Sequence, residues 1–302
     1  MGTWVEIVVE GADAGDLRRA TDAAYREMTR LSDMMNHYDP NSVVSAINRA
    51  AGAQPVAVPP ELMTVLRMAQ DVSQRTGGAF DITVGSLTGW RFRPDDPRRP
   101  APDSIEAQLP NVDWRRLRLD AAAGTAYLER RGARIDLGGI AKLYILDAGR
   151  RALAAHGIEH AMINGGGDVV VMGTTRGRPW RIGIRHPRAP QQLLGVVEAT
   201  SGFVVSSGDY ERYFVMDGKR YHHILDPRTG YPAQGPRHVT LVAEKLEFVN
   251  GYGTAIMVLG TATGKKLVAD SPGLEGLIVN GDGSLWVSPG LSAHFTPAVP
   301  GN

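Results

Sequence analysis

The chain contains no cysteine, and this absence excludes several kinds of chemistry. Disulfide bonds, thiolate metal centres and cysteine nucleophiles are all ruled out. Long apolar runs are also absent, because no apolar segment reaches the roughly 20 residues of a membrane-spanning helix. No basic-then-apolar leader precedes the strand-like pattern that follows Met1-Gly2-Thr3. We therefore expect a cytoplasmic protein as the sequence is written, or a periplasmic one if a leader has been removed.

An excess of charge of one sign is absent as well. The 33 Lys and Arg nearly balance the 32 Asp and Glu, so the net charge is +1. Such a chain has no general field that would attract nucleic acid, and we expect no nucleic-acid partner. The 302 residues are enough for a large core, and the 36 Gly and 19 Pro favour a loop-rich α+β protein over a helical bundle.

The periodicity of apolar residues predicts both helices and strands. Helical spacing covers about residues 16–35, from Pro60 to just before Gly77, 141–156, and 251–269. Alternating or short apolar runs predict strands at 5–9, 161–163, 168–172, 180–185, 195–199, 203–205, 239–243 and 276–280, with two more around a turn at 121–124. Strands in series without regular helices between them favour antiparallel sheets. We expect one α+β domain over residues 1–302, with an exposed insertion or lid at 91–113.

The stretch from His222 to Pro232 carries the most chemistry. It combines two imidazoles, the carboxylate of Asp226 and the guanidinium of Arg228 within a loop shaped by Pro and Gly. Such a loop can direct a histidine and an arginine toward one small anionic group. The alternative is an ordinary hairpin loop with common turn residues.

Other segments are individually weak signals. Residues 135–142 form a glycine-containing turn into a helix, where backbone N–H groups and Lys142 would attract phosphate, unless this is only a tight turn. Asp81 could hydrogen-bond a ring N–H or simply cap the next element. Tyr38 lies in a polar turn, where a flat ring can stack on a ligand or remain a half-buried loop residue.

Together these segments resemble the ApbE-type FAD:protein FMN transferases, from Met1 to about Gly260. The matching segments occur in the family's order: Met1-Gly2-Thr3, Tyr38-Asp39-Pro40-Asn41-Ser42, Gly78-Ala79-Phe80-Asp81-Ile82-Thr83, Asp136-Leu137-Gly138-Gly139-Ile140-Ala141-Lys142, Asn164-Gly165-Gly166-Gly167-Asp168, Ser207-Gly208-Asp209-Tyr210-Glu211-Arg212, and His223 to Pro232. The resemblance implies a tunnelling-fold-like α+β architecture that holds FAD. It also implies that an acceptor Thr hydroxyl of a partner protein attacks the FMN-side phosphorus, with release of AMP.

The resemblance also implies roles for individual residues. The positions that match FAD contacts are Met1, Tyr38, Ala79, Phe80, Asp81, Asp136, Lys142 and Ile224, with Tyr38 at the isoalloxazine. The positions that match Mg²⁺ ligands are Gly139, Asn250, Gly253 and Thr254. A Thr hydroxyl is a poor nucleophile, so a base is useful, and His223 is the candidate, with Asp226 to orient it.

Two departures from the family pattern bear on function. Asn250 stands where the family has Asp, so a neutral oxygen replaces a charged Mg²⁺ ligand, and Gly251 and Gly253 are expected to loosen the helix start. Leu143 stands where the family has Gly, and its side chain would project toward the cofactor cleft or into helix packing. Two other readings therefore accompany the transferase: an FAD pyrophosphatase giving AMP and FMN, and a flavin-binding protein with little turnover.

Overall fold

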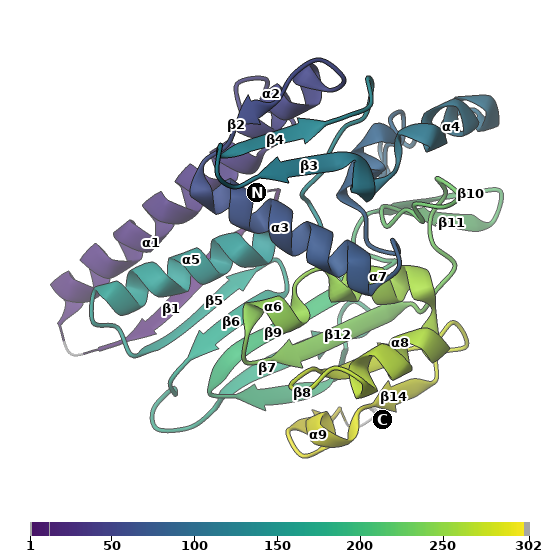
Figure 1. Ribbon diagram of the computed structural model, residues 1–302. Coiled ribbons are helices and arrows are strands. Elements are labelled where there is room, and N and C mark those ends of the chain that lie inside the picture. The colour runs from purple at the N-terminus through teal and green to yellow at the C-terminus, as the bar shows by residue number, and fades with distance from the viewer. Residues whose placement is uncertain (1, 12, 299–302) are drawn as a thin grey trace.

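A seven-stranded antiparallel sheet forms the centre of the molecule. The protein is described here by a computed structural model that covers residues 2–11 and 13–298. The strand order is β1-β5-β6-β9-β12-β13-β14 (Figure 1). The bounds are β1 Val5–Glu10, β5 His160–Gly165, β6 Asp168–Met172, β9 Ser201–Gly208, β12 His238–Ala243, β13 Glu275–Val279 and β14 Leu285–Val287. Every pairing is antiparallel, which confirms the expected α+β class.

Three smaller antiparallel sheets surround this one. Their strands are β2 Val56–Ala57, β3 Leu117–Asp120 and β4 Thr125–Leu128; β7 Trp180–Arg185, β8 Leu193–Ala199 and β15 Phe295–Pro297; and β10 Tyr213–Met216 with β11 Lys219–His222. The expected turn at 121–124 does separate β3 from β4. Asp120 stabilises it by accepting the N–H groups of Ala122 and Ala123.

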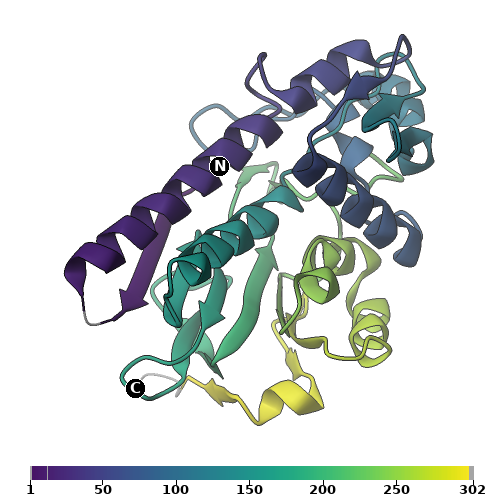
Figure 2. The same ribbon diagram turned by 60° about the vertical axis from the view of Figure 1, so that its left-hand side comes forward.

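Helices cover one face of the central sheet. The longest is α1 Ala14–Met35, whose N-cap Asp13 accepts the N–H of Asp16 at 2.7 Å. Helix α5 Ala141–Ala155 packs against α1 (Figure 2). The contact is close because a Cβ placed on Gly149 of α5 would lie 2.8 Å from the Sδ of Met28 in α1. Glycine at this position therefore sets the distance between the two helices.

The remaining helices correct several sequence-based expectations. They are α2 Val43–Ala50, α3 Pro60–Arg75, α4 Pro102–Gln108, α6 Leu246–Val249, α7 Tyr252–Leu259, α8 Thr261–Ala269 and α9 Pro289–Ser292, with short 3₁₀ turns η1 Ile82–Ser86, η2 Leu109–Asn111 and η3 Trp114–Arg116. The single helix expected at 251–269 was wrong, because Gly260 (φ 84°) separates α7 from α8. Helix α2 was not expected, although Ser42 caps it. The segment 91–113 contains α4, which its Pro-rich sequence concealed.

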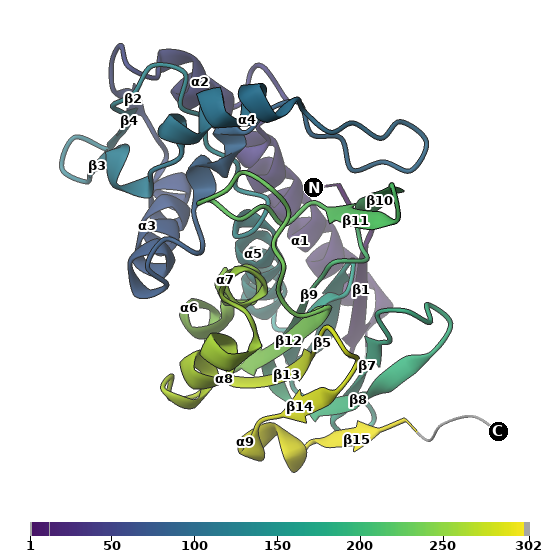
Figure 3. The ribbon, with the colours of Figure 1, turned by 90° about the vertical axis from the view of Figure 1, so that its right-hand side faces the viewer.

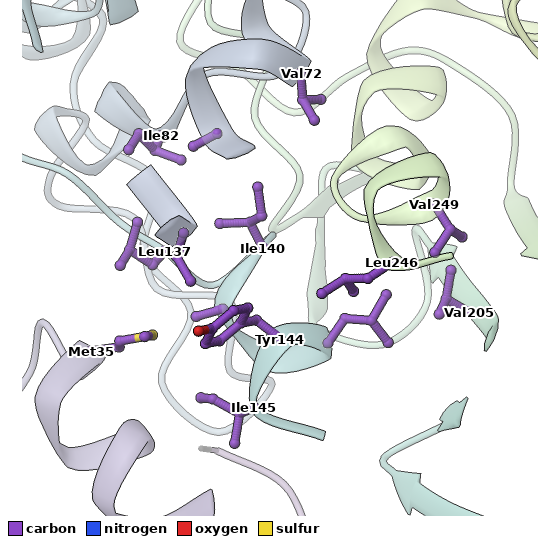
Figure 4. Packing of buried hydrophobic residues seen from close by; sticks show 14 of the residues in the cluster. Met35, Val72, Ile82, Leu137, Ile140, Tyr144, Ile145, Val205, Leu246 and Val249 are labelled. Carbon is purple, nitrogen blue, oxygen red and sulfur yellow. The ribbon is translucent and has the colours of Figure 1, made fainter. Parts of the chain in front are cut away.

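The apolar core lies on both faces of the central sheet. On the helical face, residues of α1, α3, α5 and α7 pack against alternate strand positions such as Val170. Figure 4 shows Leu137, Ile140 and Tyr144 within this cluster, with Met35 on one side and Leu246 on the other. On the opposite face, Val169 and Val171 pack against the sheet of β7, β8 and β15. No helix within the described residues is long and apolar enough to cross a membrane.

The tight contact between α1 and α5 gives a stability prediction. We expect Gly149→Leu to lower the free energy of unfolding by about 3 kcal/mol, because the new side chain meets Met28 and Ile163 in a packed core. Urea denaturation measures this loss. The control Ala154→Leu adds the same side chain on the exposed side of α5 and should change stability little. Equal losses in both variants would contradict the proposed spacing role of Gly149.

Candidate functional site

Two neighbouring histidines, His222 at the end of β11 and His223 in the loop that follows, have different roles. The ring of His222 is buried, donates from Nε2 to the Ala233 carbonyl at 2.9 Å, and accepts the Ile224 N–H at Nδ1 at 3.3 Å. Both ring nitrogens are therefore used, and burial lowers the pKa of His222. This histidine shapes the loop. It also helps to bury Ile224, one of the positions expected to contact FAD.

His223 has a free ring nitrogen instead. Its backbone N–H donates to the carbonyl of Arg212, the residue before β10, at 3.1 Å, which fixes the start of the loop against the start of that strand. Its Nδ1 is buried and has no hydrogen-bond partner among the described residues. Burial lowers the pKa of His223 to about 3, and the positive charge of Arg212 contributes to this shift. The ring is neutral at physiological pH, so a lone pair is available to accept a proton.

Asp226 does not orient His223. Its carboxylate accepts the Arg228 backbone N–H at 2.9 Å and two guanidinium hydrogen bonds at 2.9 and 2.7 Å. Residues two apart in this turn let the arginine side chain fold back onto the carboxylate as a fork. The expected His223–Asp226 pair is thus replaced by an Asp226–Arg228 pair. The carboxylate stabilises the Asp-Pro-Arg turn and contacts no histidine.

Lys142, on the first turn of α5, forms an ion pair with Asp168. The Nζ to Oδ2 distance is 2.7 Å, and Asp168 is buried. The other oxygen of Asp168 accepts the Ser206 N–H at 3.0 Å, so β9 holds the carboxylate in place. The pair fixes the position of the lysine ammonium, which also lies near enough to His223 to lower its pKa. A phosphate placed here would meet a lysine that is already oriented.

A buried row of polar groups continues from Ser206 into the core. The Ser206 hydroxyl contacts Thr240 Oγ1 at 3.0 Å, Thr240 contacts His238 Nε2 at 2.6 Å, and His238 Nδ1 contacts the Tyr210 hydroxyl at 2.7 Å. His238 and Thr240 are fully buried. Every hydroxyl and ring nitrogen in the row has a partner, as buried polar groups require. The row therefore connects Tyr210 to Ser206 in β9, the residue whose N–H binds Asp168.

The segment Ala79–Asp81 lies in the core and not on an open surface. Asp81 accepts the N–H and hydroxyl of Thr83 at 2.7 and 2.6 Å and the N–H of Trp114 at 2.9 Å. Burial raises the pKa of Asp81, although these donors oppose the shift. Of the two alternatives for Asp81, capping is the one that the contacts show. Ala79 and Phe80 are buried beside it.

Tyr38 is exposed and borders a hollow of about 230 Å³. Its ring lies 3.9 Å from that of His37, centroid to centroid, and His37 Nδ1 lies 3.3 Å from Asp136 Oδ1. Asp136 also accepts the Gly138 N–H at 2.7 Å, which shapes the turn before α5. The structure therefore places Tyr38 and Asp136 close together through His37. An exposed ring 78% accessible is a suitable stacking surface for a flat heterocycle.

The positions expected to hold metal also converge, at the starts of α5 and α7. A Cβ on Gly139 would lie 3.5 Å from Thr254 Oγ1 and 3.1 Å from the Phe80 ring. The buried Asn250 donates from Nδ2 to the Ile140 carbonyl at 3.0 Å. Gly139, Thr254 and Asn250 therefore surround one small region beside Phe80.

The two glycines around Tyr252 have structural reasons that the sequence did not show. Gly251 has φ 82° and caps α7, and a Cβ there would lie 3.4 Å from the Phe80 ring. A Cβ on Gly253 would lie 2.7 Å from Ser207 Oγ. The expectation that they loosen the helix start was wrong, because they permit close packing. Leu143 is buried in the apolar core, so of its two expected directions it takes helix packing. Met1 lies outside the described residues.

Asp168, Ser206 and His238 contribute to this region but were not singled out as site residues. Asp168 ends the Asn164–Asp168 motif, which is notable in the sequence only for its glycines, and Ser206 lies mid-strand with no local motif. The partner of each lies on a distant part of the chain, as in the 38-residue separation of Asp168 and Ser206. Only the alternation of β9 and β12, which faces Ser206 toward Thr240, hints at the row.

The buried His238 predicts a dependence of stability on pH. In the unfolded chain this histidine protonates near its ordinary pKa of 6.5, whereas burial lowers the pKa of His238 to about 4 in the folded protein. Between these values the unfolded state binds more protons, so the free energy of unfolding falls as pH falls. We expect the wild type to lose about 3 kcal/mol more than His238→Gln between pH 7 and 4. Equal losses in urea denaturation of both proteins would contradict this.

The sequence of this chain is similar to those of proteins whose family is known. A family model described as the ApbE family matches residues 1–278. A FAD:protein FMN transferase of Treponema pallidum is 30% identical over 295 residues, covering 92% of this chain and 82% of that protein. One from Klebsiella pneumoniae is 32% identical, covering 92% and 87%.

Solved structures show the same likeness. The ApbE protein of Thermotoga maritima has a TM-score of 0.89 and 36% identity, covering 97% of this chain and 96% of its own. The flavin transferase ApbE of Vibrio cholerae has a TM-score of 0.83 and 28% identity, with the same coverage. Because the family model matches residues 1–278 and a relative at 30% identity covers 92% of the chain, this chain belongs to the ApbE family.

Proposed function

We propose that this protein transfers FMN from FAD to a Thr hydroxyl of an acceptor protein and releases AMP. The observation that carries the proposal is the free, buried Nδ1 of His223 beside the Lys142–Asp168 pair. Family membership supports the reaction class. The exposed Tyr38 and the turn at Asp136 supply a surface for the flavin.

The chemistry follows from the charges around His223. The hydroxyl oxygen of the acceptor forms a bond to the FMN-side phosphorus, the phosphoanhydride bond breaks, and AMP leaves with the bonding electrons. His223 takes the hydroxyl proton. Lys142 and Arg212 lower the pKa of His223 in the protein without substrate. A bound diphosphate would offset these positive charges and raise the pKa toward a value useful for proton transfer.

A metal ion at the α5–α7 junction fits only in part. Gly139, Thr254 and Asn250 offer oxygen atoms, which suit a hard cation, but all are neutral. No group of three or more His, Asp or Glu side chains within the described residues is arranged to hold a metal. We propose that Mg²⁺ binds here only together with FAD, whose phosphates supply the missing negative charge. When bound, Mg²⁺ would stabilise the charge on the diphosphate.

The neutral ligand set also favours a second function, flavin binding with little turnover. Without a carboxylate at position 250, Mg²⁺ binding depends on the substrate alone, and slow cleavage would leave FAD bound. AMP release and the fate of the flavin separate these two functions from each other and from a pyrophosphatase. A transferase gives AMP in equal amount to flavin attached to a Thr-containing peptide, a pyrophosphatase gives AMP and free FMN, and a flavin holder gives neither.

The first prediction here concerns His223. We expect His223→Ala to lower the rate of flavin transfer by roughly 10²- to 10⁴-fold, the usual contribution of a general base. FAD binding, followed by quenching of flavin fluorescence, should change little. The matched control is His222→Gln, which removes structural hydrogen bonds and should lower stability while retaining activity in the folded protein. Full activity in His223→Ala would show that His223 is not the base.

The second prediction concerns Asn250. In Asn250→Asp a carboxylate oxygen faces the Ile140 carbonyl, so we expect a loss of about 1–3 kcal/mol in EDTA. Mg²⁺ should restore this loss without FAD, because the site then has a charged ligand. The wild type should show no stabilisation by Mg²⁺ alone.

The control for this experiment is Asn48→Asp. Asn48 also donates to a backbone carbonyl, but to that of Ile135 at 3.1 Å and not to that of Ile140. The Asn48→Asp variant should be less stable than the wild type, and Mg²⁺ should not restore the lost stability. Thermal unfolding with EDTA and with Mg²⁺ measures all three proteins. The same response to Mg²⁺ in both variants would argue against residue 250 as a metal position.

A further inference from the structure

The hairpin β10–β11 stands apart from the central sheet and leads directly to His223. It forms a sheet of only two strands among the described residues. Asp217 and Gly218 connect the strands with φ 51° and 71°, the two positive angles of a type I′ turn. A two-stranded sheet alone is only marginally stable in water. Something else must therefore hold this hairpin in place.

An aromatic cluster fastens the hairpin to the insertion. The Phe214 and Tyr221 rings stack across the strands with centroids 5.2 Å apart. Phe92 of the insertion stacks on Phe214 at 6.2 Å, and Trp90 lies 6.0 Å from Tyr221. Trp90 Nε1 also donates at 3.2 Å to the carbonyl of Gly230, in the loop of residues 223–232. These contacts thus connect the insertion, the hairpin and the loop of residues 223–232 into one surface, and Figure 3 shows the backbone of the hairpin apart from the central sheet.

This surface carries positive charge without carboxylate partners. The basic residues are Arg98, Arg99, Arg212, Lys219 and Arg220, and none of them forms an ion pair with a described residue. Several lie against aromatic atoms instead. Arg99 donates to the Tyr221 hydroxyl at 3.0 Å, Lys219 lies 5.6 Å from the Tyr221 ring centre, and Arg220 lies 3.8 Å from that of Tyr213.

Four of the acidic residues nearby form ion pairs with arginines outside this set of cations. Asp96 binds Arg91 and Asp95 binds Arg93 within the insertion. Beside the hairpin, Asp209 binds Arg188 and Glu211 binds Arg185. Three carboxylates, Asp217 in the hairpin turn and Asp103 and Glu106 of α4, have no ion-pair partner among the described residues, against five such cations. The surface therefore has a local excess of positive charge, although the whole chain has a net charge of only +1.

The edge of β11 offers backbone hydrogen bonds beside these charges. His223 N–H donates to the Arg212 carbonyl, so this pair is hydrogen-bonded and the pairs alternate from it along the hairpin. The backbone groups of Arg220 and His222 then point away from β10, and of these two residues His222 is buried whereas Arg220 is half-buried. An extended chain added along this edge would run toward His223. This is how peptide segments bind exposed sheet edges.

We propose that the β10–β11 hairpin with Arg98 and Arg99 docks an extended, acidic segment of the acceptor protein and delivers its Thr to His223. This rests on the proposed transferase function and names the binding surface for its second substrate. The diphosphate of FAD would account for Arg212, which lies beside His223, but not for the charges farther along the hairpin. Lys219 lies four residues along the chain from His223, about 13 Å in a strand, beyond the reach of phosphates held beside the histidine.

The test uses a set of synthetic peptides with one central Thr in a Gly/Ser background. The set carries four Glu, four Gln or four Lys at the same flanking positions. We expect the Glu peptide to be flavinylated with the lowest KM, and this preference to weaken with added salt. In Arg98→Glu/Lys219→Glu the KM for the Glu peptide should rise about tenfold. The KM for FAD and the AMP released without peptide should not change.

Two controls isolate the effect. Arg26→Glu reverses an exposed charge on α1, away from the hairpin, and should leave the KM for the Glu peptide unchanged. The Arg98 side chain has no hydrogen bond or ion pair within the described part of the chain, so a smaller rise in KM in Arg98→Glu alone cannot come from misfolding. Binding of the rhodamine-labelled Glu peptide, followed by anisotropy without FAD, measures docking independently of transfer.

The outcomes separate the two proposals. Equal KM values for the Glu, Gln and Lys peptides, or an unchanged KM in the double variant, would overturn the docking surface and leave the transferase standing. Binding of the Glu peptide that the double variant weakens, with no flavin attached to any peptide, would overturn the transferase and support the surface. Absence of both binding and transfer would overturn both.

Discussion

The hydrogen bond from Asn250 to the Ile140 carbonyl joins the two helix starts on which the candidate site depends. Ile140 precedes α5, which carries Lys142, and Asn250 precedes α7, which carries Thr254. A buried amide N–H and a carbonyl satisfy each other without any ion. The geometry of this junction is therefore fixed by the protein alone. A carboxylate at the same position would need a cation to relieve its repulsion with the carbonyl, so one residue determines whether folding here is linked to metal.

Electrostatics divide the molecule into a neutral interior and a positive rim. Burial keeps His222, His223 and His238 uncharged, and Lys142 is balanced by Asp168. Five cations without ion-pair partners among the described residues gather on the hairpin and at Arg98 and Arg99, and some of them rest on aromatic rings. Neutral histidines keep a lone pair for accepting protons, and charges at the rim act at longer range on approaching anions. The division lets one region perform chemistry and the other select a partner.

The sequence predicted much of this fold because its signals are local. The helical spacing over about residues 16–35 predicted α1, which begins two residues earlier at Ala14, and alternation predicted most strands of the central sheet. Prediction from the sequence failed where contacts between residues outside a local pattern determine the structure. Gly260 breaks the last helix through a backbone angle that glycine permits but does not require. Asp226 was assigned to a histidine by proximity in the loop, but a guanidinium two residues away binds it in two places.

The same limit explains why the glycines near Asn250 were misjudged. A glycine at a helix start lowers helix propensity when it is considered alone. At Gly251 the backbone adopts φ 82°, and both glycines lie against side chains, Phe80 for Gly251 and Ser207 for Gly253. A larger residue would push α7 away from Phe80 and β9, and with it Thr254 away from Gly139. The apparent weakness in the helix is therefore what allows the expected ligands of the site to meet.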